Sequence, residues 1–204
     1  LDNLSYYQQW AGSATAIGGY SYLRNKRGDI LINPATGLPI KNTNFLPIGD
    51  RNPDFSVGLR NSFTYKSINL SFLLDIRKGG DVFNGNAMWL YERGLSTKTL
   101  DRNTPIIYKG VLRDGYENTD NPTPNTVQIT PSTSTNQSFY SSLAESDFVE
   151  HNINWLRMRD VSLSYSLPSK VLSSVKWVKN ASIFVRGTEL FLITNYTGAD
   201  PSVN

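Results

Sequence analysis

The sequence predicts an all-β chain built from antiparallel strands, and three observations lead to that prediction. Residues 57–80, "VGLRNSFTYKSINLSFLLDIRKGG", alternate apolar and polar side chains and then stop at two glycines. The same alternation returns in residues 161–167 and again in residues 181–186. A period of two places successive side chains on opposite faces of a strand. These segments are therefore expected to be strands with one apolar and one polar face.

The first two strands are expected near residues 57–66 and 68–77, as a hairpin that turns at Lys66 and Ser67. With this turn, apolar residues lie opposite one another, as Phe63 does with Leu70. A slip of one residue would move every side chain to the other face, so matching apolar faces fix the register. Lys-Ser is not the preferred Asn-Gly pair, and the type of turn stays open.

Two environments suit an apolar face of this length. Antiparallel sheets of soluble proteins show the same alternation, so the pattern alone favours a soluble β-sandwich. The connections favour a membrane barrel, because a minimal turn at one end contrasts with roughly 75 residues before the next strand at the other. Each leg also has the length of about ten residues that a tilted strand needs to cross a bilayer. At this point both interpretations stand.

The next two strands are expected near residues 155–167 and 181–193. Leu163, Tyr165 and Leu167 share one face, whereas Leu156 and Met158 have the opposite parity. Either a bulge near Arg159 and Asp160 changes the register, or the strand has left the membrane before that point.

Residues 78–154 are predicted to form a long loop between the second and third strands. A short helix is expected over Ala87–Arg93, with Asn86 as its N-cap and Gly94 as its stop. Residues 118–138 contain three prolines and few apolar side chains. Such a stretch cannot bury a core of its own.

Composition excludes several classes of protein. The 204 residues include 20 basic and 17 acidic side chains, interleaved along the chain, so nucleic acid is not an expected partner. No run approaches the roughly 18 apolar residues of a spanning helix. Aromatic residues form 12% of the chain, which suits both membrane interfaces and sugar-binding surfaces. The absence of cysteine means that no disulfide is used.

The motifs of enzyme chemistry are missing, and we predict no catalytic residue, cofactor or metal site. A single histidine, His151, without cysteine does not form a zinc or Cys-His site. Neither a GxSxG elbow nor a glycine-rich phosphate loop is present. The protein is therefore not expected to be an enzyme.

Two groups of residues are candidates for binding. The first comprises aromatic and arginine side chains of the long loop, which could stack on a sugar or contact a partner protein. Its members are Trp89, Tyr91, Arg93, Tyr108, Arg113, Tyr116 and Tyr140. The alternative is that these side chains only pack the loop onto itself. The second group, Arg60, Asp75 and Arg77, is on the polar face of the hairpin and could line a conduit; equally, these residues could satisfy one another across the strands.

Four stretches give the chain a family resemblance. They are "GDRNPDFSVGLRNSFTYKSINLSFLLDIRKGGDVFNG", "TLDRNTP", "FVEHNINWLRMRDVSLSYSLP" and "ASIFVRGTELFLITNYTGADP", in this order between Tyr20 and Pro201. Together they resemble the C-terminal barrel region of SusC/RagA-type TonB-linked outer-membrane receptors.

The resemblance implies a fold and a function. The fold is an antiparallel transmembrane β-barrel, part of a large, 22-stranded barrel, with residues 78–154 as a long extracellular loop. The function is TonB-dependent import of oligosaccharides or peptides across the bacterial outer membrane, together with a SusD-like surface lipoprotein. Residues 1–204 would form a partial barrel domain, with the plug domain and the segment that contacts the TonB complex outside the chain. The competing hypothesis is a soluble β-rich surface domain that binds glycans or acts as an adhesin.

Overall fold

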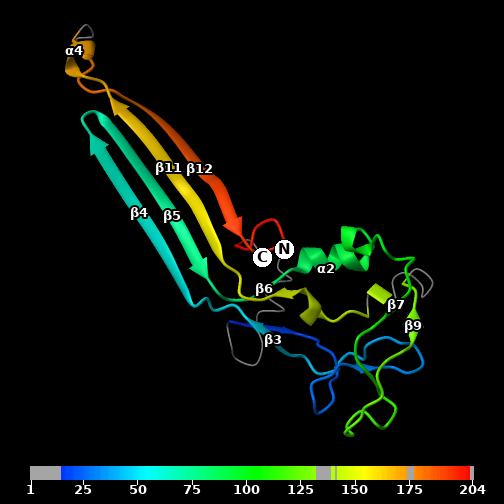
Figure 1. Cartoon of the computed structure of the whole chain (residues 1–204). Coiled ribbons are helices and arrows are strands. Elements are labelled where there is room, and N and C mark those ends of the chain that lie inside the picture. Colours follow the sequence, from blue (N-terminus) through cyan, green and yellow to red (C-terminus); the bar gives the residue numbers. More distant parts are fainter. Residues whose placement is uncertain (1–14, 132–138, 141, 174–176, 203–204) are drawn as a thin grey trace. The chain divides into compact units, whose positions relative to one another are not determined.

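The computed structural model describes residues 15–131, 139–140, 142–173 and 177–202 (Figure 1). The chain divides into two compact units. The strand unit comprises Asn52–Gly80 and Asn152–Thr197. The loop unit comprises Leu1–Arg51, Asp81–His151 and Gly198–Asn204.

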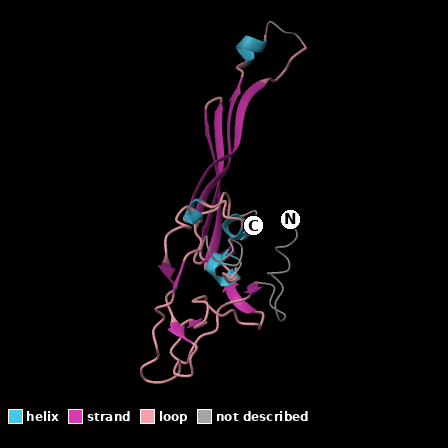
Figure 2. Cartoon of the chain, turned by 90° about the vertical axis from the view of Figure 1, so that its right-hand side faces the viewer, coloured by secondary structure: helices cyan, strands magenta, loops and turns pink. Residues whose placement is uncertain are grey.

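The strand unit is a four-stranded antiparallel sheet in the order β12-β11-β5-β4. Its strands are β4 (Phe55–Tyr65), β5 (Ile68–Lys78), β11 (Trp155–Ser166) and β12 (Ser182–Thr194). All four lie within two residues of the ranges expected from the alternation. A four-residue helix, α4 (Ser169–Leu172), lies in the connection between β11 and β12. Figure 2 shows the four strands as a single layer.

The hairpin of β4 and β5 has the predicted register. Val57 pairs with Ile76 and Phe63 pairs with Leu70. The turn is made by Lys66 and Ser67, and Lys66 has a φ of 53°. A positive φ at this position is typical of the tight hairpin turns whose twist matches that of the strands.

A bulge in β11 resolves the parity problem of that strand. Its register shifts between Met158 and Asp160 against both neighbouring strands, which leaves Arg159 as the extra residue. Leu156 and Met158 therefore lie on the same face as Val161 and the apolar residues beyond it. The first of the two alternatives, a bulge near Arg159 and Asp160, is confirmed.

Strand β12 has a matching irregularity. Met158 pairs with Phe191 and Asp160 pairs with Thr188, so Glu189 and Leu190 lie between the two pairs. Glu189 has a φ of 50°, in the left-handed region that non-glycine residues rarely adopt. Both strands thus bulge at the same level of the sheet.

The loop unit is built from short elements. Antiparallel pairs are formed by β1 (Ala16–Gly19) with β3 (Leu46–Asp50), β6 (Val82–Phe83) with β10 (Val149–Glu150), and β7 (Ile106–Ile107) with β9 (Gln128–Ile129). Strand β2 (Leu31–Ile32) pairs in parallel with β8 (Val111–Leu112). The helical elements are α2 (Gly85–Glu92), η1 (Thr97–Thr99) and η2 (Glu145–Phe148).

The core of the loop unit joins segments that are distant in the sequence. It consists of Ile17, Phe83, Met88 and Val149, against which Ile48 and Phe148 pack. These residues come from β1, β6, α2 and β10, with β3 and η2 at the edge. Described residues of the segment 78–154, such as Phe83, Met88 and Val149, therefore pack against Ile17 and Ile48 of the N-terminal part of the chain.

The N-cap of α2 differs from the prediction. Asn84, not Asn86, caps the helix: its Oδ1 accepts a hydrogen bond from the Ala87 amide at 2.9 Å. The Nδ2 of Asn84 also donates to Glu150 at 2.7 Å, and the side chain is buried. This second partner favours Asn84 over the exposed Asn86. Gly94, with a φ of 66°, ends the helix as predicted.

None of the helices in the described part of the chain is long and apolar enough to cross a bilayer.

The junction after β5 should depend on glycine at position 79. Gly79 has a φ of 81°, and a Cβ there would lie 2.9 Å from the Asp54 amide nitrogen. We expect Gly79→Ala to lower the free energy of unfolding by about 1–3 kcal/mol. Gly58→Ala is the control, since a Cβ at Gly58 meets nothing within 4 Å. Urea unfolding in detergent micelles, followed by tryptophan fluorescence, measures both; equal midpoints would contradict this account.

Candidate functional site

One face of the strand unit is almost entirely apolar. The cross-strand registers place these side chains on it: Val57, Leu59, Phe63, Tyr65, Ile68, Leu70, Phe72, Leu74, Ile76, Leu156, Met158, Val161, Leu163, Tyr165, Ile183, Val185, Phe191 and Ile193. Two polar residues lie on this face: Asn61, which pairs with Phe72, and Lys78, which pairs with Phe55 at the end of β5. At Gly187, Leu190 fills the space that a side chain would occupy, with its Cδ2 2.7 Å from the position of a Cβ.

This apolar face is exposed. Phe63 is 58% exposed, Leu163 50% and Ile193 63%, and these residues come from three different strands. In a β-sandwich, a second layer would cover such a face. Soluble monomers rarely expose apolar patches that extend over a whole sheet. The face is therefore built to contact an apolar medium or a further protein layer.

The opposite face carries the polar residues, including all three candidates from the hairpin. Asp75 pairs with Gly58, Arg60 pairs with Leu73, and Arg77 pairs with Ser56. Arg60 is exposed, and it forms no ion pair with the residues that the structure describes. The guanidinium of Arg77 lies 4.8 Å from the ring centre of Trp155, over its face.

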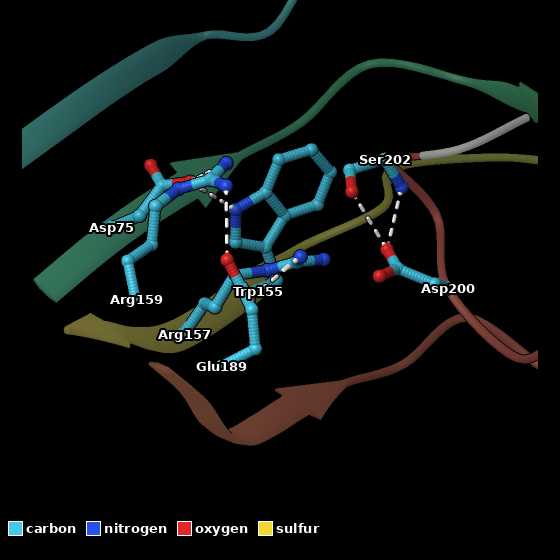
Figure 3. A network of polar contacts seen from close by, with 7 residues as sticks. All are labelled: Asp75, Trp155, Arg157, Arg159, Glu189, Asp200 and Ser202. Atoms are coloured by element: carbon cyan, nitrogen blue, oxygen red, sulfur yellow. Dashed lines mark hydrogen bonds and ion pairs between the residues drawn. The ribbon is translucent and has the colours of Figure 1, made fainter. Parts of the chain in front are cut away.

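A network of charged side chains crosses the polar face at the level of the bulges (Figure 3). Arg159, the bulged residue, donates to Asp75 Oδ2 from Nη2 at 2.7 Å and from Nε at 3.0 Å. Its Nη1 donates to Glu189 at 3.3 Å, and Arg157 donates to Glu189 at 3.1 Å. Trp155 Nε1 lies 3.4 Å from the same Asp75 oxygen. The network therefore connects β5, β11 and β12.

The partners of Asp75 were not foreseen from the sequence. The charged residues of "RMRD" lie where the alternation of apolar and polar residues fails. This failure was the feature of the sequence that could have indicated the special position of Arg159. Nothing in the sequence points to Glu189, because its position depends on the second bulge. In the loop unit, Figure 3 also shows Asp200 accepting from the amide and the hydroxyl of Ser202, both at 2.8 Å.

The aromatic candidates of the long loop separate into three groups. Trp89, 50% exposed, stacks with the exposed Arg93, whose guanidinium lies 5.0 Å from the ring centre. Tyr116, 64% exposed, and the exposed Arg113 both belong to the segment that follows β8. The remaining residues, Tyr91, Tyr108 and Tyr140, face the interior of the loop unit.

Tyr140 is a packing residue. Only 3% of it is exposed, and its ring makes edge contacts with Tyr91 at 5.2 Å and Phe139 at 5.1 Å between ring centres. Tyr91 also contacts Phe148. For Tyr140, the structure thus agrees with the alternative interpretation that the aromatic side chains pack the loop onto itself.

Tyr108 belongs to a hydrogen-bonded cluster that the sequence did not reveal. The Tyr22 hydroxyl donates to Asp147 at 2.5 Å and accepts from the Ala144 amide at 2.9 Å. The Tyr108 hydroxyl lies 3.3 Å from that of Tyr22 and 3.5 Å from Asp147. Because 125 positions separate Tyr22 from Asp147, no local pattern could have paired them.

Burial dominates the electrostatics of this cluster. It raises the pKa of the Tyr22 hydroxyl, and the bond to Asp147 raises it further. The pKa values of Tyr108 and Tyr91 are raised by burial as well. Burial also raises the pKa of Asp147, against the opposing effect of the two tyrosine hydroxyls. The cluster therefore favours the protonated form of each of these groups.

No group of three or more His, Cys, Asp or Glu side chains among the described residues could hold a metal ion.

No family model matches the sequence. Curated relatives from Formosa agariphila do match. TonB-dependent receptor P3 is 26% identical over 157 residues, which cover 77% of this chain and 14% of the relative. TonB-dependent receptor P39 is 24% identical and P26 is 26% identical, each over 91% of this chain and 16% of the relative.

The chain is a homologue of TonB-dependent receptors. This confirms the resemblance seen in the sequence. The chain spans about one-seventh of the length of these receptors, as the covered shares of 14% and 16% show. A solved structure, "Structure of the RagAB peptide transporter", matches the fold with a TM-score of 0.50 and 15% identity, over 93% of this chain and 20% of that chain. Sequence and fold are thus both consistent with an all-β fragment of a barrel for this TonB-dependent receptor homologue.

The charged network of this homologue should contribute to its stability. We expect Arg159→Met to lower the free energy of unfolding by about 1–2 kcal/mol, because Asp75 and Glu189 lose a charged donor. The value lies at the low end for charged hydrogen bonds since the Arg159 side chain is 40% exposed. Arg60→Met, on the same face, is the control. Urea unfolding checks both, and similar losses for the two variants would refute a structural role for the network.

The tyrosine cluster should limit the stability of the protein at alkaline pH. Because the native state holds the Tyr22 proton more tightly than the unfolded state, this contribution to stability is complete below the ordinary pKa of about 10 and is lost as pH rises further. We expect Tyr22→Phe to cost about 1–3 kcal/mol at neutral pH, since Asp147 and the Ala144 amide lose a partner. The decline above pH 10 should also become less steep.

Tyr116→Phe serves as the control, because the Tyr116 ring is exposed. Urea midpoints measured from neutral to alkaline pH test the expectation. A Tyr22→Phe curve that runs parallel to the wild-type curve would show that Tyr22 does not set the limit.

Proposed function

We propose that the chain forms part of the wall and the surface loops of a TonB-dependent importer in the bacterial outer membrane. One observation carries the proposal: the apolar face of the strand unit is continuous over four strands and is exposed. Strands of 11 to 13 residues have the length that crosses a bilayer when tilted. Lipid on one side and a wet lumen on the other would satisfy both faces.

The bulges support this setting. In a strand that crosses a membrane, apolar residues must stay on the lipid side along its whole length. The paired bulges of β11 and β12 keep Leu156 and Met158 on the same side as Val161. They also keep the charges of Arg157 and Arg159 on the polar side. A charge on the lipid side would cost about 2–4 kcal/mol near the middle of the bilayer.

We infer that the cargo is an oligosaccharide or a peptide, delivered with a SusD-like surface lipoprotein and moved with energy from the TonB complex. The names of the relatives support TonB dependence, and the transporter with the matching fold is described as one for peptides. In this proposal residues 78–154 lie on the outside, and the strands near 57–66, 68–77, 155–167 and 181–193 form part of the barrel wall.

Within the loop unit, the exposed pair of Trp89 and Arg93 is the best-placed candidate for contact with cargo or partner. An aromatic ring with a guanidinium above it can stack on a sugar ring or a peptide side chain. Tyr116 and Arg113 offer a second exposed surface. On the polar face of the strands, Arg60 remains the candidate for lining a conduit, whereas Asp75 and Arg77 are engaged with Arg159 and Trp155.

A cysteine scan tests the proposal, because the chain contains no cysteine of its own. Single cysteines at Leu59, Leu70 and Leu163 would carry nitroxide labels in the complete receptor, with its other cysteines replaced, in proteoliposomes. We expect these labels to be accessible to oxygen and protected from a water-soluble nickel chelate. Labels at Ser62, Ser71 and Ser164, on the opposite face, should show the reverse.

The opposite result has a clear meaning. If labels at Leu59, Leu70 and Leu163 are protected from both reagents, a protein layer covers the face. A soluble surface-binding or adhesin domain would then replace the importer. Solubility without detergent would lead to the same conclusion.

A further inference from the structure

The two short connections of the strand unit lie at one end of the sheet. One is the turn at Lys66 and Ser67, and the other joins β11 to β12, with residues 167–173, which include α4, and residues 177–181 as its described parts (Figure 1). Cross-strand pairing places Tyr65, Ile68, Tyr165 and Ile183 in one row at this end. We call the two connections, with Tyr65 and Tyr165, the basic rim.

The basic rim exposes aromatic and aliphatic side chains. Trp177 is 86% exposed, Tyr65 71% and Val171 59%. Tyr65 and Tyr165 are the last aromatic residues on the apolar face before the connections begin. Tryptophan and tyrosine with this placement are characteristic of the level of a bilayer where headgroups meet acyl chains.

The charge of the rim is of one sign. Residues 65–68 contain Lys66, and residues 166–182 contain Lys170, Lys176 and Lys179, with no aspartate or glutamate in either stretch. Lys66, Lys170 and Lys179 are exposed, and the Lys66 ammonium lies 5.3 Å from the ring centre of Tyr65.

The acidic residues of the four strands lie elsewhere. They are Asp75, Asp160 and Glu189, and each is paired with an arginine at the level of the bulges. Cationic groups at the rim therefore have no anionic side chain in the connections themselves. The charge of the rim is complementary to an anionic surface.

We propose that the basic rim binds the headgroups of anionic phospholipids in the adjacent leaflet, with Trp177 inserted at the headgroup level. The inference rests on the proposed membrane setting of the apolar face and adds a lipid preference to it. A basic residue close to an anionic surface contributes about 1 kcal/mol, which corresponds to roughly a fivefold preference for each lysine. The combination of lysines with a neighbouring aromatic ring favours a headgroup layer over a soluble anion, because both parts of the rim are then satisfied.

Quenching of Trp177 tests the proposal. The complete receptor is reconstituted in phosphatidylcholine vesicles that contain either brominated phosphatidylglycerol or brominated phosphatidylcholine. A Trp177→Phe variant isolates the signal of this residue. We expect stronger quenching by the brominated anionic lipid in the wild type. The Lys66→Gln, Lys170→Gln, Lys179→Gln triple variant should lose this preference by roughly fivefold for each lysine that contacts the leaflet.

A matched triple variant, Lys26→Gln, Lys98→Gln, Lys109→Gln, removes the same charge from exposed positions of the loop unit. It should keep the wild-type preference. An equal preference in the rim variant and the wild type would overturn the proposal, as would quenching of Trp177 by aqueous iodide but not by lipid.

The labels at Leu70 and Leu163 distinguish failure of the rim proposal from failure of the proposed function. If they report lipid while Trp177 shows no preference for the anionic lipid, the rim proposal is wrong and the membrane setting stands. If they report a protein layer, the proposed function fails and the rim proposal fails with it.

Discussion

The strand unit depends on a register that keeps apolar side chains on one face across four strands. Each pairing transfers the pattern to the next strand, from Val57 opposite Ile76 to Ile76 opposite Leu156 and Leu156 opposite Ile193. Because the side-chain period is two, a single error in one strand would place its whole apolar set on the polar face. The register that pairs the backbones of the four strands is thus the same one that separates the apolar face from the polar face.

The bulges show how this constraint is reconciled with charged residues. A regular β11 would place Leu156 and Met158 on the polar face, together with Trp155 and Arg157 on the apolar one. One additional residue, Arg159, corrects the parity, and its side chain then reaches Asp75 on one neighbour and Glu189 on the other. The irregular backbone of Glu189 costs of order 1–3 kcal/mol, which the charged hydrogen bonds on three strands offset. The bulge and the network therefore stabilise each other.

The sequence was sufficient to predict the strands but not to predict the contacts between distant segments. Alternation located all four strands and the hairpin register, because period two is a local property. It left β11 undecided, since a bulge and an early strand end produce the same break in the pattern. In α2, Asn84 and Asn86 were equivalent as local caps, and Glu150, 66 positions from Asn84, decided between them. The cluster of Tyr22 and Asp147 could not be predicted for the same reason, because it depends on burial and on a contact between residues 125 positions apart.

These constraints restrict substitution at some positions of the chain much more than at others. In the proposed membrane setting, any polar replacement on the apolar face leaves a group without a hydrogen-bond partner in lipid. On the polar face the network fixes Asp75, Arg157 and Arg159. In the loop unit, Tyr22 and Tyr140 are fixed by burial. The residues that packing leaves free are exposed ones such as Trp89, Arg93, Arg113 and Tyr116. Binding specificity in proteins commonly resides on loops that a rigid scaffold positions. If the chain belongs to an importer as proposed, a change of cargo or partner therefore requires changes at these exposed positions and leaves every strand pair unaltered.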